Sequence, residues 1–278
     1  MGILQLLRPK QWLKNLMLIF PPLFGGALFR LEVCLELVIP VLAFCLASSA
    51  NYAFNDVLDA DKDALHPTKK NRPIPAGKVS KKSALFLSVL LLMGALLSAF
   101  YTSRPFMWML IAYVLLMGGY SVWLKHFALL DIFCIAAGFL LRLEAGGNAT
   151  RIPVSSWLFL SVFFLAVFLS TGKRFGEKLV LDNVASSHRK TLADYPDTYL
   201  DGLMLMTGTA AMLTYALYSI DHAPLIYSVP LCCLGLFRYL FWIKKGNSGD
   251  PTEALLQDRM LLGISIVWMT LVAYVVYG

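Results

Sequence analysis

Charged residues are scarce in this chain. Asp, Glu, Lys and Arg together make up 15% of its 278 residues, whereas a soluble domain has roughly 25%. Hydrophobic residues make up 58% instead, and the mean hydropathy is +0.68. This composition excludes an ordinary soluble domain and indicates an integral membrane protein.

Cysteine and histidine are also few, which limits the kinds of site that the chain can build. No cysteine spacing is typical of a metal site or of a disulfide framework, and no His–Asp pairing is evident. All five cysteines lie in or beside apolar runs: Cys34, Cys45, Cys134, Cys232 and Cys233. We interpret them as small buried hydrophobic residues.

Long apolar runs are what the sequence has in abundance. A transmembrane helix needs about 20 mainly apolar residues, and inside lipid only a helix satisfies the backbone hydrogen bonds of such a run. We therefore predict an all-α integral membrane protein with nine transmembrane helices. The predicted spans are 15–30, 35–55, 82–101, 105–122, 128–146, 154–173, 202–220, 224–243 and 260–277.

The basic residues are distributed unevenly between the two predicted sides. Of the 24 Lys and Arg residues, three fall on the side opposite the N-terminus, namely Arg30, Arg104 and Arg151. Because positive charge marks cytoplasmic segments, this predicts a cytoplasmic N-terminus. The net charge of +7 then faces anionic lipid headgroups, so we expect no nucleic acid partner.

Two predicted connections are much longer than the others. They cover about 56–81 and about 174–201, and both fall on the cytoplasmic side. Long connections in a compact protein are commonly functional. We predict a single transmembrane domain over residues 1–278 that carries two functional loops.

The first loop begins with the run NDVLDADKD. Asn55, Asp59 and Asp63 are spaced four apart, so they share a face if the helix continues, and Asp56 lies beside them. Such carboxylates repel one another unless a cation lies between them. Because Mg²⁺ prefers oxygen ligands, we predict that these four side chains bind it. We expect Asp61 to be solvated, and the alternative for the whole run is a solvated helix end.

Basic residues follow the acidic run in HPTKKNRPIPAGKVS, where the prolines end the helix. Lys69, Lys70 and Arg72 place cations near the predicted metal ligands. Carboxylates that hold Mg²⁺ and cations that hold phosphate oxygens together form a diphosphate-binding set.

The second loop, GKRFGEKLVLDNVASSHRK, carries two basic groups. We predict that Lys173, Arg174, Arg189 and Lys190 bind a substrate together with Glu177. The alternative for both basic groups is a basic helix end whose side chains extend to the membrane interface.

Further polar residues lie near the predicted site. Lys14 and Asn15 close the opening segment RPKQWLKN, and Asn51 lies one turn before Asn55 on the same predicted helix face. We include these residues among the predicted substrate-binding side chains.

Two other polar pairs are assigned mainly structural roles. Arg142 and Glu144 lie late in their predicted helix, so we expect them to be structural. Asp258 and Arg259 start the last helix, where capping is expected and an approach to the site is the alternative.

The run NDVLDADKD followed by HPTKKNRPIPAG resembles the aspartate-rich motif NDxxDxxxD of the UbiA superfamily of intramembrane prenyltransferases. The segment RPKQWLKN and the nine-helix pattern are similar to that superfamily too. The resemblance implies a nine-helix bundle around a central cavity open to lipid. It also implies that Mg²⁺ and a diphosphate bind beneath cytoplasmic loops.

Four later segments are similar to one branch of that superfamily, the decaprenyl-phosphate phosphoribosyltransferases. They read LLDIFCIAAGFLLRLEAGG, GKRFGE, HRKTLADYPDTYL and DPTEALLQDRML. The resemblance implies Mg²⁺-dependent transfer of 5-phosphoribose from phosphoribosyl diphosphate (PRPP) to decaprenyl or another polyprenyl phosphate, with release of diphosphate. It further implies a bacterial inner-membrane enzyme that supplies decaprenylphosphoryl arabinose for cell-wall arabinan, and it is compatible with a homo-oligomer.

The second loop separates this branch from its relatives. Aromatic prenyltransferases of the superfamily carry a second aspartate-rich motif there, whereas Lys173–Glu177 contains one acidic and two basic residues. Two phosphorylated substrates need more positive charge than an aromatic ring does. The loop therefore favours phosphoribosyl transfer.

The expected chemistry needs no strong general base, because a polyprenyl phosphate is already ionised near pH 7. Asp56, Asp59 and Asp63 are the predicted catalytic residues, since the metal that they hold stabilises charge on the leaving diphosphate. How the basic residues divide the remaining phosphates stays open. The alternatives are an aromatic prenyltransferase that uses a polyprenyl diphosphate, and a transporter. A transporter is disfavoured because coupling ions bind near the midplane.

Overall fold

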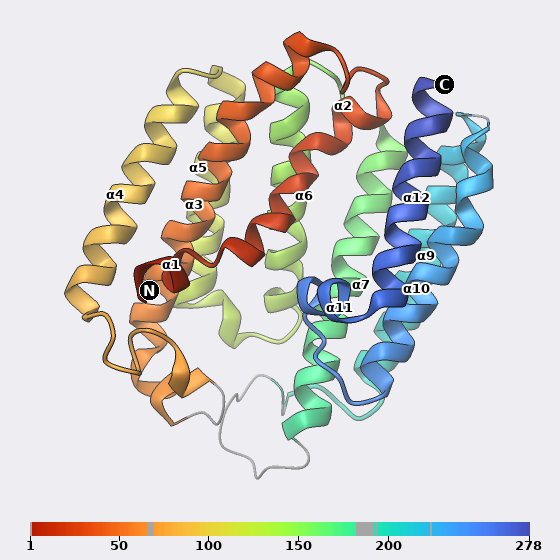
Figure 1. Ribbon diagram of the computed structural model, residues 1–278. Coiled ribbons are helices and arrows are strands. Elements are labelled where there is room, and N and C mark those ends of the chain that lie inside the picture. The colour runs from red at the N-terminus through yellow and green to blue at the C-terminus, as the bar shows by residue number, and fades with distance from the viewer. Residues whose placement is uncertain (1, 66–68, 182–191, 193, 223) are drawn as a thin grey trace. The chain divides into compact units, whose positions relative to one another are not determined.

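Helices form most of the chain that the computed structural model describes, which is residues 2–65, 69–181, 192, 194–222 and 224–278 (Figure 1). Within these residues no strand occurs. The α-helices are α1 (Gly2–Leu7), α2 (Phe20–Phe24), α3 (Leu31–Ala64), α4 (Lys81–Phe100), α5 (Arg104–Val122), α6 (Leu130–Thr150), α7 (Ser156–Leu181), α9 (Tyr199–Ile220), α10 (Val229–Lys244), α11 (Pro251–Gln257) and α12 (Arg259–Tyr277). The 3₁₀ helices are η1 (Pro9–Ile19), η2 (Lys69–Asn71), η3 (Leu124–His126) and η4 (Leu225–Ser228).

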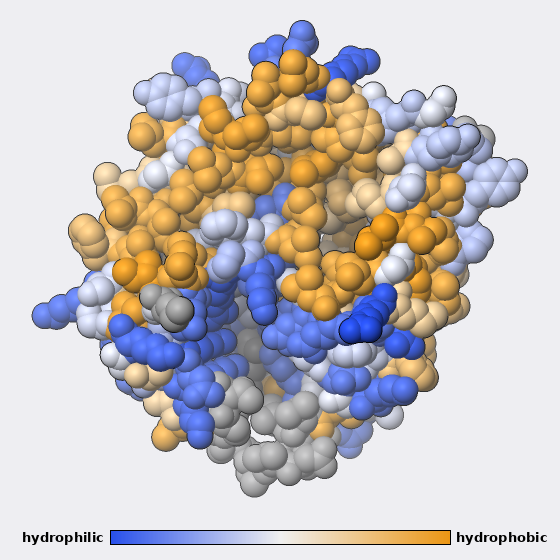
Figure 2. All heavy atoms as spheres, in the orientation of Figure 1, coloured by the Kyte–Doolittle hydropathy of each residue, from blue (hydrophilic) through white to orange (hydrophobic). Residues whose placement is uncertain are grey.

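Seven helical segments of the described chain are long and apolar enough to cross a membrane. They are α3, α4, α5, α7, α9, η4 with α10, and α12. Their outer faces expose large hydrophobic residues, such as Phe86 and Met93 of α4, which suits lipid rather than water. Figure 2 shows hydrophobic residues along α3 and α4 and hydrophilic residues near the C-terminal end of α3. The prediction of an all-α multi-pass membrane protein is confirmed.

Two of the nine predicted spans are not among these seven helical segments. The segment 15–30 is not one α-helix, because η1 occupies its first part and α2 has five residues. Pro21 and Pro22 fall in that stretch and lack the amide hydrogens that a regular helix needs. The predicted span 128–146 is α6, which is helical but carries Asp131 and two further charges.

The helices α3 and α7 extend further than hydropathy predicts. The helix α3 continues to Ala64, so the acidic run lies on a helix rather than in a loop that starts near residue 56. Likewise α7 continues to Leu181, so Arg174–Glu177 lies on the helix instead of in the loop predicted from about residue 174. Hydropathy marks only the lipid-embedded part of a helix, because the part beyond the hydrocarbon can be polar.

The contacts divide the chain into two compact units. Unit 1 comprises 1–22, 27–134 and 141–153, and unit 2 comprises 23–26, 135–140 and 154–278. In unit 1, Phe44 of α3 packs against Phe106 and Tyr113 of α5, with ring centroids 5.8 and 5.2 Å away. In unit 2, α7, α9, α10 and α12 enclose a core that contains Phe168 and Tyr239. The single domain expected over 1–278 stays a prediction.

Candidate active site

The last three turns of α3 carry Asp56, Asp59 and Asp63 on one side of the helix. Asp56 and Asp63 are buried, and Asp59 is partly exposed. Asp61 points elsewhere: its side chain is 89% exposed and pairs with Lys81 at the start of α4. The prediction that Asp61 is solvated is therefore confirmed. Buried carboxylates need partners, and each of the other three has a cation beside it.

Arg72 bridges two of these carboxylates. Its Nη1 donates to Oδ1 of Asp56 at 3.2 Å and to Oδ2 of Asp63 at 2.5 Å. The chain returns to α3 through η2, and Ile74 then packs in a small apolar cluster with Leu6 and Ala60. The buried Ile74 thereby holds Arg72, two residues earlier in the chain, against the acidic helix.

Arg8 reaches the same carboxylate from the N-terminal segment. Its Nη2 donates to Oδ1 of Asp56 at 2.5 Å, and its guanidinium lies 5.0 Å from the ring centroid of Tyr52. The backbone of Arg8 has φ 50° and ψ 58°, a left-handed conformation that is uncommon for this residue type. Arg8 was not among the predicted binding residues, which included Lys14 and Asn15 from the other end of RPKQWLKN.

Lys125 is the third cation, and it was also missed. Its Nζ donates to Oδ1 and Oδ2 of Asp59 at 2.7 and 2.9 Å and to Oδ1 of Asn55 at 3.1 Å. Asn55 in turn donates to Asp59 at 2.9 Å. Lys125 lies in η3, between two long apolar helices. A basic residue in a short connection at the same end as the acidic run was the available signal.

The side-chain oxygen atoms of this cluster are of the chemical kind that binds a magnesium ion. Asp56 and Asp63 already share one positively charged nitrogen, Nη1 of Arg72, so a cation bridges two carboxylates in this structure. Oxygen ligands of this kind suit Mg²⁺. The described residues contain no group of three or more His, Cys, Asp or Glu side chains arranged around a metal position. The present geometry is therefore that of ion pairs.

The other predicted residues of unit 1 lie in different surroundings. Asn15 is 1% exposed and accepts a hydrogen bond from Arg142. Asn51 donates to the carbonyl of Ala47, one turn earlier on α3. Lys14 is half-buried on η1, and Lys69 and Lys70 lie in η2, where Lys70 is exposed. Lys14, Asn15, Asn51 and Lys70 are not part of the ion-pair cluster, and the role of all these residues in binding stays a prediction.

Unit 2 places the predicted basic residues on the last turns of α7. Lys173 pairs with Asp250 at 3.1 Å, and Nη1 of Arg174 donates to Glu177 at 2.8 Å. Arg174 is only 1% exposed, so it is not an interfacial side chain that extends to water. The predicted binding residues Arg189 and Lys190 lie outside the described residues.

Glycines bring the connection after α10 into contact with α7. A Cβ on Gly249 would lie 2.3 Å from the carbonyl oxygen of Gly172, and one on Gly176 would lie 2.7 Å from the amide nitrogen of Gly249. Tyr239 fixes the crossing by donating to the carbonyl of Gly249 at 2.7 Å. This crossing sets Asp250 beside Lys173.

Asp258 caps α12, as the sequence predicts. It accepts from the amides of Met260 and Leu261 and from Nε of Arg238, the last at 2.7 Å. Burial acts to raise the pKa of Asp258, but the bonds from Arg238 and the two amides outweigh it and hold that pKa below its ordinary value.

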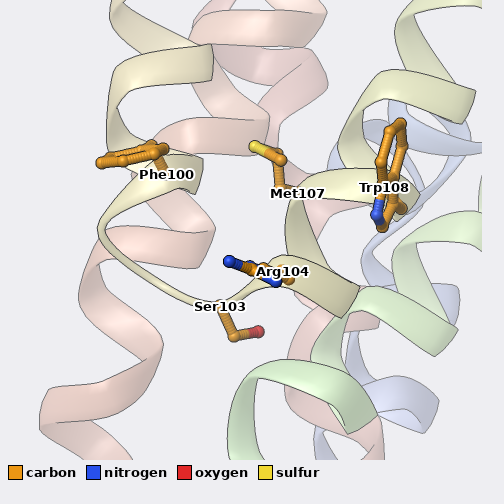
Figure 3. A pocket seen from close by; sticks show the side chains of 5 residues that line it. All are labelled: Phe100, Ser103, Arg104, Met107 and Trp108. Atoms are coloured by element: carbon orange, nitrogen blue, oxygen red, sulfur yellow. The ribbon is translucent and has the colours of Figure 1, made fainter.

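A separate pocket of about 430 Å³ lies at the turn between α4 and α5, lined by Phe100, Ser103, Arg104, Met107 and Trp108 (Figure 3). The helix α4 starts at Lys81 near the acidic cluster, and its 20 residues span about 30 Å at 1.5 Å per residue. The pocket is therefore at the opposite end of unit 1 and does not belong to the candidate site.

The chain is similar to known proteins in its sequence and in its fold. The profile of the UbiA prenyltransferase family matches residues 19–264. A decaprenyl-phosphate phosphoribosyltransferase of Corynebacterium glutamicum is 34% identical over 99% of this chain and 87% of its own length. The enzyme of the same name from Mycobacterium tuberculosis is 32% identical over 100% of this chain and 95% of its own.

Solved structures show a similar fold. A UbiA homologue from Archaeoglobus fulgidus bound to GPP and Mg²⁺ superimposes with a TM-score of 0.76, covering 99% of both chains at 20% sequence identity. At that level of identity, the likeness supports the arrangement of the helices and no more.

Proposed function

Since the chain belongs to the UbiA prenyltransferase family, we propose which reaction it catalyses: transfer of the 5-phosphoribosyl group of PRPP to a polyprenyl phosphate, with release of diphosphate. The observation that carries this proposal is the full-length match to decaprenyl-phosphate phosphoribosyltransferases at 32–34% identity. The basic residues of α7 support it, because two phosphorylated substrates require cations.

In this proposal the acidic cluster binds the diphosphate of PRPP. Asp56, Asp59 and Asp63, with Asn55, would hold Mg²⁺, which when bound supplies positive charge to the leaving diphosphate. Each carboxylate would then release the cation that it holds in the present structure. Arg72, freed from two carboxylates, is placed to donate to phosphate oxygens, where an arginine makes strong charge-assisted bonds.

Arg8 and Lys125 extend the same set. Both pair with the acidic residues here, so each can pass from a carboxylate to a phosphate oxygen of the incoming substrate without leaving the end of α3. We propose that these two residues bind the diphosphate together with Lys69, Lys70 and the side chain of Asn51.

The remaining phosphates need cations too. We propose that Lys14, Lys173, Arg174, Arg189 and Lys190 hold the 5-phosphate of PRPP and the acceptor phosphate. Glu177 orients the buried guanidinium of Arg174 through their 2.8 Å bond. The acceptor oxygen attacks C1 of the ribose as the C1–diphosphate bond breaks. The acceptor is already an anion, so no residue has to remove a proton from it.

The membrane setting follows from the same reasoning. The chain is a multi-pass membrane protein, and the distribution of Lys and Arg supports an N-terminus and a candidate site on the cytoplasmic side. We propose a bacterial inner-membrane enzyme whose product serves the synthesis of decaprenylphosphoryl arabinose for cell-wall arabinan.

One competition experiment tests the reaction. Purified protein in lipid is incubated with Mg²⁺ and either labelled PRPP plus polyprenyl phosphate, or labelled polyprenyl diphosphate plus an aromatic acid. We expect label to enter the lipid phosphate in the first mixture only. Product in the second mixture alone would replace the proposal with aromatic prenyl transfer.

A further inference from the structure

An arginine is buried inside the helices of unit 1. Arg142 of α6 is 4% exposed, and its Nε donates to Oδ1 of Asn15 at 2.8 Å. Its Nη2 donates to the hydroxyl of Tyr113 at 2.7 Å, and its guanidinium stacks 4.4 Å from the centroid of that ring. Arg142 therefore ties α6 to both η1 and α5.

The partner Asn15 belongs to a series of contacts that joins η1 to α3. Asn15 donates to Sγ of Cys45 at 3.3 Å, and Nε1 of Trp12 donates to Oγ of Ser49 at 3.0 Å. Further along, Arg8 pairs with Asp56, as described above. The contact positions descend along η1 while they ascend along α3, so the two segments lie antiparallel in one fixed register. At one end of this series is Arg142, and at the other is the candidate site.

A second contact from α6 fixes the same segment. Gly146 lies one helical turn after Arg142, and a Cβ at that position would be 2.1 Å from the carbonyl oxygen of Leu18. The backbones of α6 and η1 touch there because glycine has no side chain. Since residues four apart share a helix face, one face of α6 holds η1 at both Asn15 and Leu18.

The segment η1 depends on such contacts for its position. It is an 11-residue 3₁₀ helix, and runs longer than three or four residues are uncommon because their hydrogen-bond geometry is poor. A buried charge is costly unless it is paired or hydrogen-bonded, so an apolar residue would be preferred at position 142 if packing alone mattered. The hydrogen bond to Asn15 of η1 is an interaction that an apolar residue at position 142 could not make.

We propose that Arg142 is a positioning residue: it fixes the register of η1 along α3 and so holds Arg8 against Asp56. The structural part of this inference is independent of the reaction, and its effect on catalysis rests on the proposed function. Arg142 itself touches no reacting group.

Hydrogen exchange of the full-length protein in lipid tests the structural part. In Arg142→Met, the amides of residues 10–19 should exchange at least about tenfold faster than in the wild type, as expected for the loss of hydrogen bonds to a charged group. Peptides from α10 and α12 should not change. The matched control is Arg238→Met, which removes a half-buried arginine of unit 2 and should leave residues 10–19 as protected as before.

The kinetic part uses a double mutant. Arg142→Met and Arg8→Met should each raise the KM for PRPP about tenfold, the effect of losing one charge-assisted bond. Both residues act through the same register of η1 along α3. The KM of the double variant should therefore be no higher than that of the more impaired single variant. Asn15→Leu breaks the same link from the other side, and it replaces Arg142→Met if that variant does not fold.

Two results would overturn the proposal. One is unchanged exchange of residues 10–19 in Arg142→Met and in Asn15→Leu. The other is a double variant whose KM increase is the product of the two single increases. A wild-type protein that transfers no phosphoribosyl group would refute the proposed function, while the exchange result would still decide the role of Arg142.

Discussion

Lys125 holds both carboxylate oxygens of Asp59, at 2.7 and 2.9 Å, across 66 positions of sequence. The pair joins the connection between α5 and α6 to the end of α3. Arg8 and Arg72 neutralise Asp56 and Asp63, so within the described residues each of the three predicted catalytic carboxylates has its own cation. The site thus carries the positive charges that a diphosphate would need.

Replacing Asp59 tests the acidic half of this arrangement. Asp59→Asn should abolish turnover and leave the protein folded, because an amide is a much weaker metal ligand than a carboxylate. Transfer of labelled phosphoribose measures the first effect, and size-exclusion elution of the purified protein measures the second. Near-wild-type activity in this variant would remove Asp59 from the site.

Replacing Lys125 tests the basic half. Lys125→Met should lower kcat/KM for PRPP by about 10- to 100-fold, which corresponds to the loss of one strong charge-assisted interaction. Lys82→Met is the matched control, because it removes the same charge from an exposed position at the start of α4. Equal losses in the two variants would show that only overall charge matters.

The Arg72–Asp63 and Lys81–Asp61 ion pairs should contribute very different amounts to the stability of the protein. Arg72→Met leaves the buried Asp63 without the arginine that it contacts here, and removing one partner of a buried pair costs about 3–5 kcal/mol. The pair of Lys81 with Asp61 is exposed, so Lys81→Met should cost less than about 1 kcal/mol. Thermal unfolding in lipid or detergent measures both. The same loss for the two variants would contradict the burial of the Arg72 pair.

Removal of divalent metal should stop the reaction. A chelator should eliminate diphosphate release from PRPP, and added Mg²⁺ should restore it, because the oxygen donors of α3 suit that ion. Asp63→Asn should raise the Mg²⁺ concentration that gives half-maximal rate. Full activity in excess chelator would refute a metal-dependent mechanism and leave only the basic side chains of the site to neutralise the diphosphate.

The glycine crossing in unit 2 should tolerate no side chain. Gly249→Ala would place its Cβ 2.3 Å from a backbone oxygen of Gly172, and such overpacking costs about 1–3 kcal/mol. Gly202→Ala is the control, since a Cβ there meets nothing within 4 Å. It lies inside α9, where alanine is favoured over glycine by roughly 0.5–1 kcal/mol. Unfolding temperatures of the two variants should therefore move in opposite directions.

The cap of α12 should make stability depend on pH. The pKa of Asp258 lies below its ordinary value of 3.8 in the folded protein, so its contribution is present above that value and is lost as the pH falls through the lower, folded pKa. Asp258→Asn keeps an N-cap side chain but cannot pair with Arg238. This variant should be less stable than the wild type at pH 7, and its free energy of unfolding should fall less steeply as the pH is lowered. Unfolding measurements from pH 7 into the acid range test this.

The acidic residues of the candidate site were predictable because their signal is local. Asn55, Asp59 and Asp63 repeat at a helical spacing on one helix, so the sequence alone places them together. Their partners Arg8 and Lys125 come from distant segments, and only tertiary packing brings them to α3. Periodicity carries no information about such contacts.

The fold shows the same division between local and tertiary information. Apolar runs predict the helices of the membrane, because lipid demands them. Hydropathy cannot show that Pro9–Ile19 is a 3₁₀ helix, because it reports composition and not the backbone hydrogen-bond pattern. In the structure this segment contacts Cys45, Ser49 and Arg142. Nor does hydropathy show that α3 continues through a polar stretch to Ala64.

The bridge that Arg72 makes between Asp56 and Asp63 has a consequence for the order of binding. If the acidic cluster holds a metal as proposed, a divalent ion that arrives alone brings no anion to replace the carboxylates that this guanidinium would lose. A PRPP molecule that already carries the metal brings phosphate oxygens to receive it. In that case Arg72 would compete with free Mg²⁺ for the two carboxylates, and we expect the ion to bind together with its substrate.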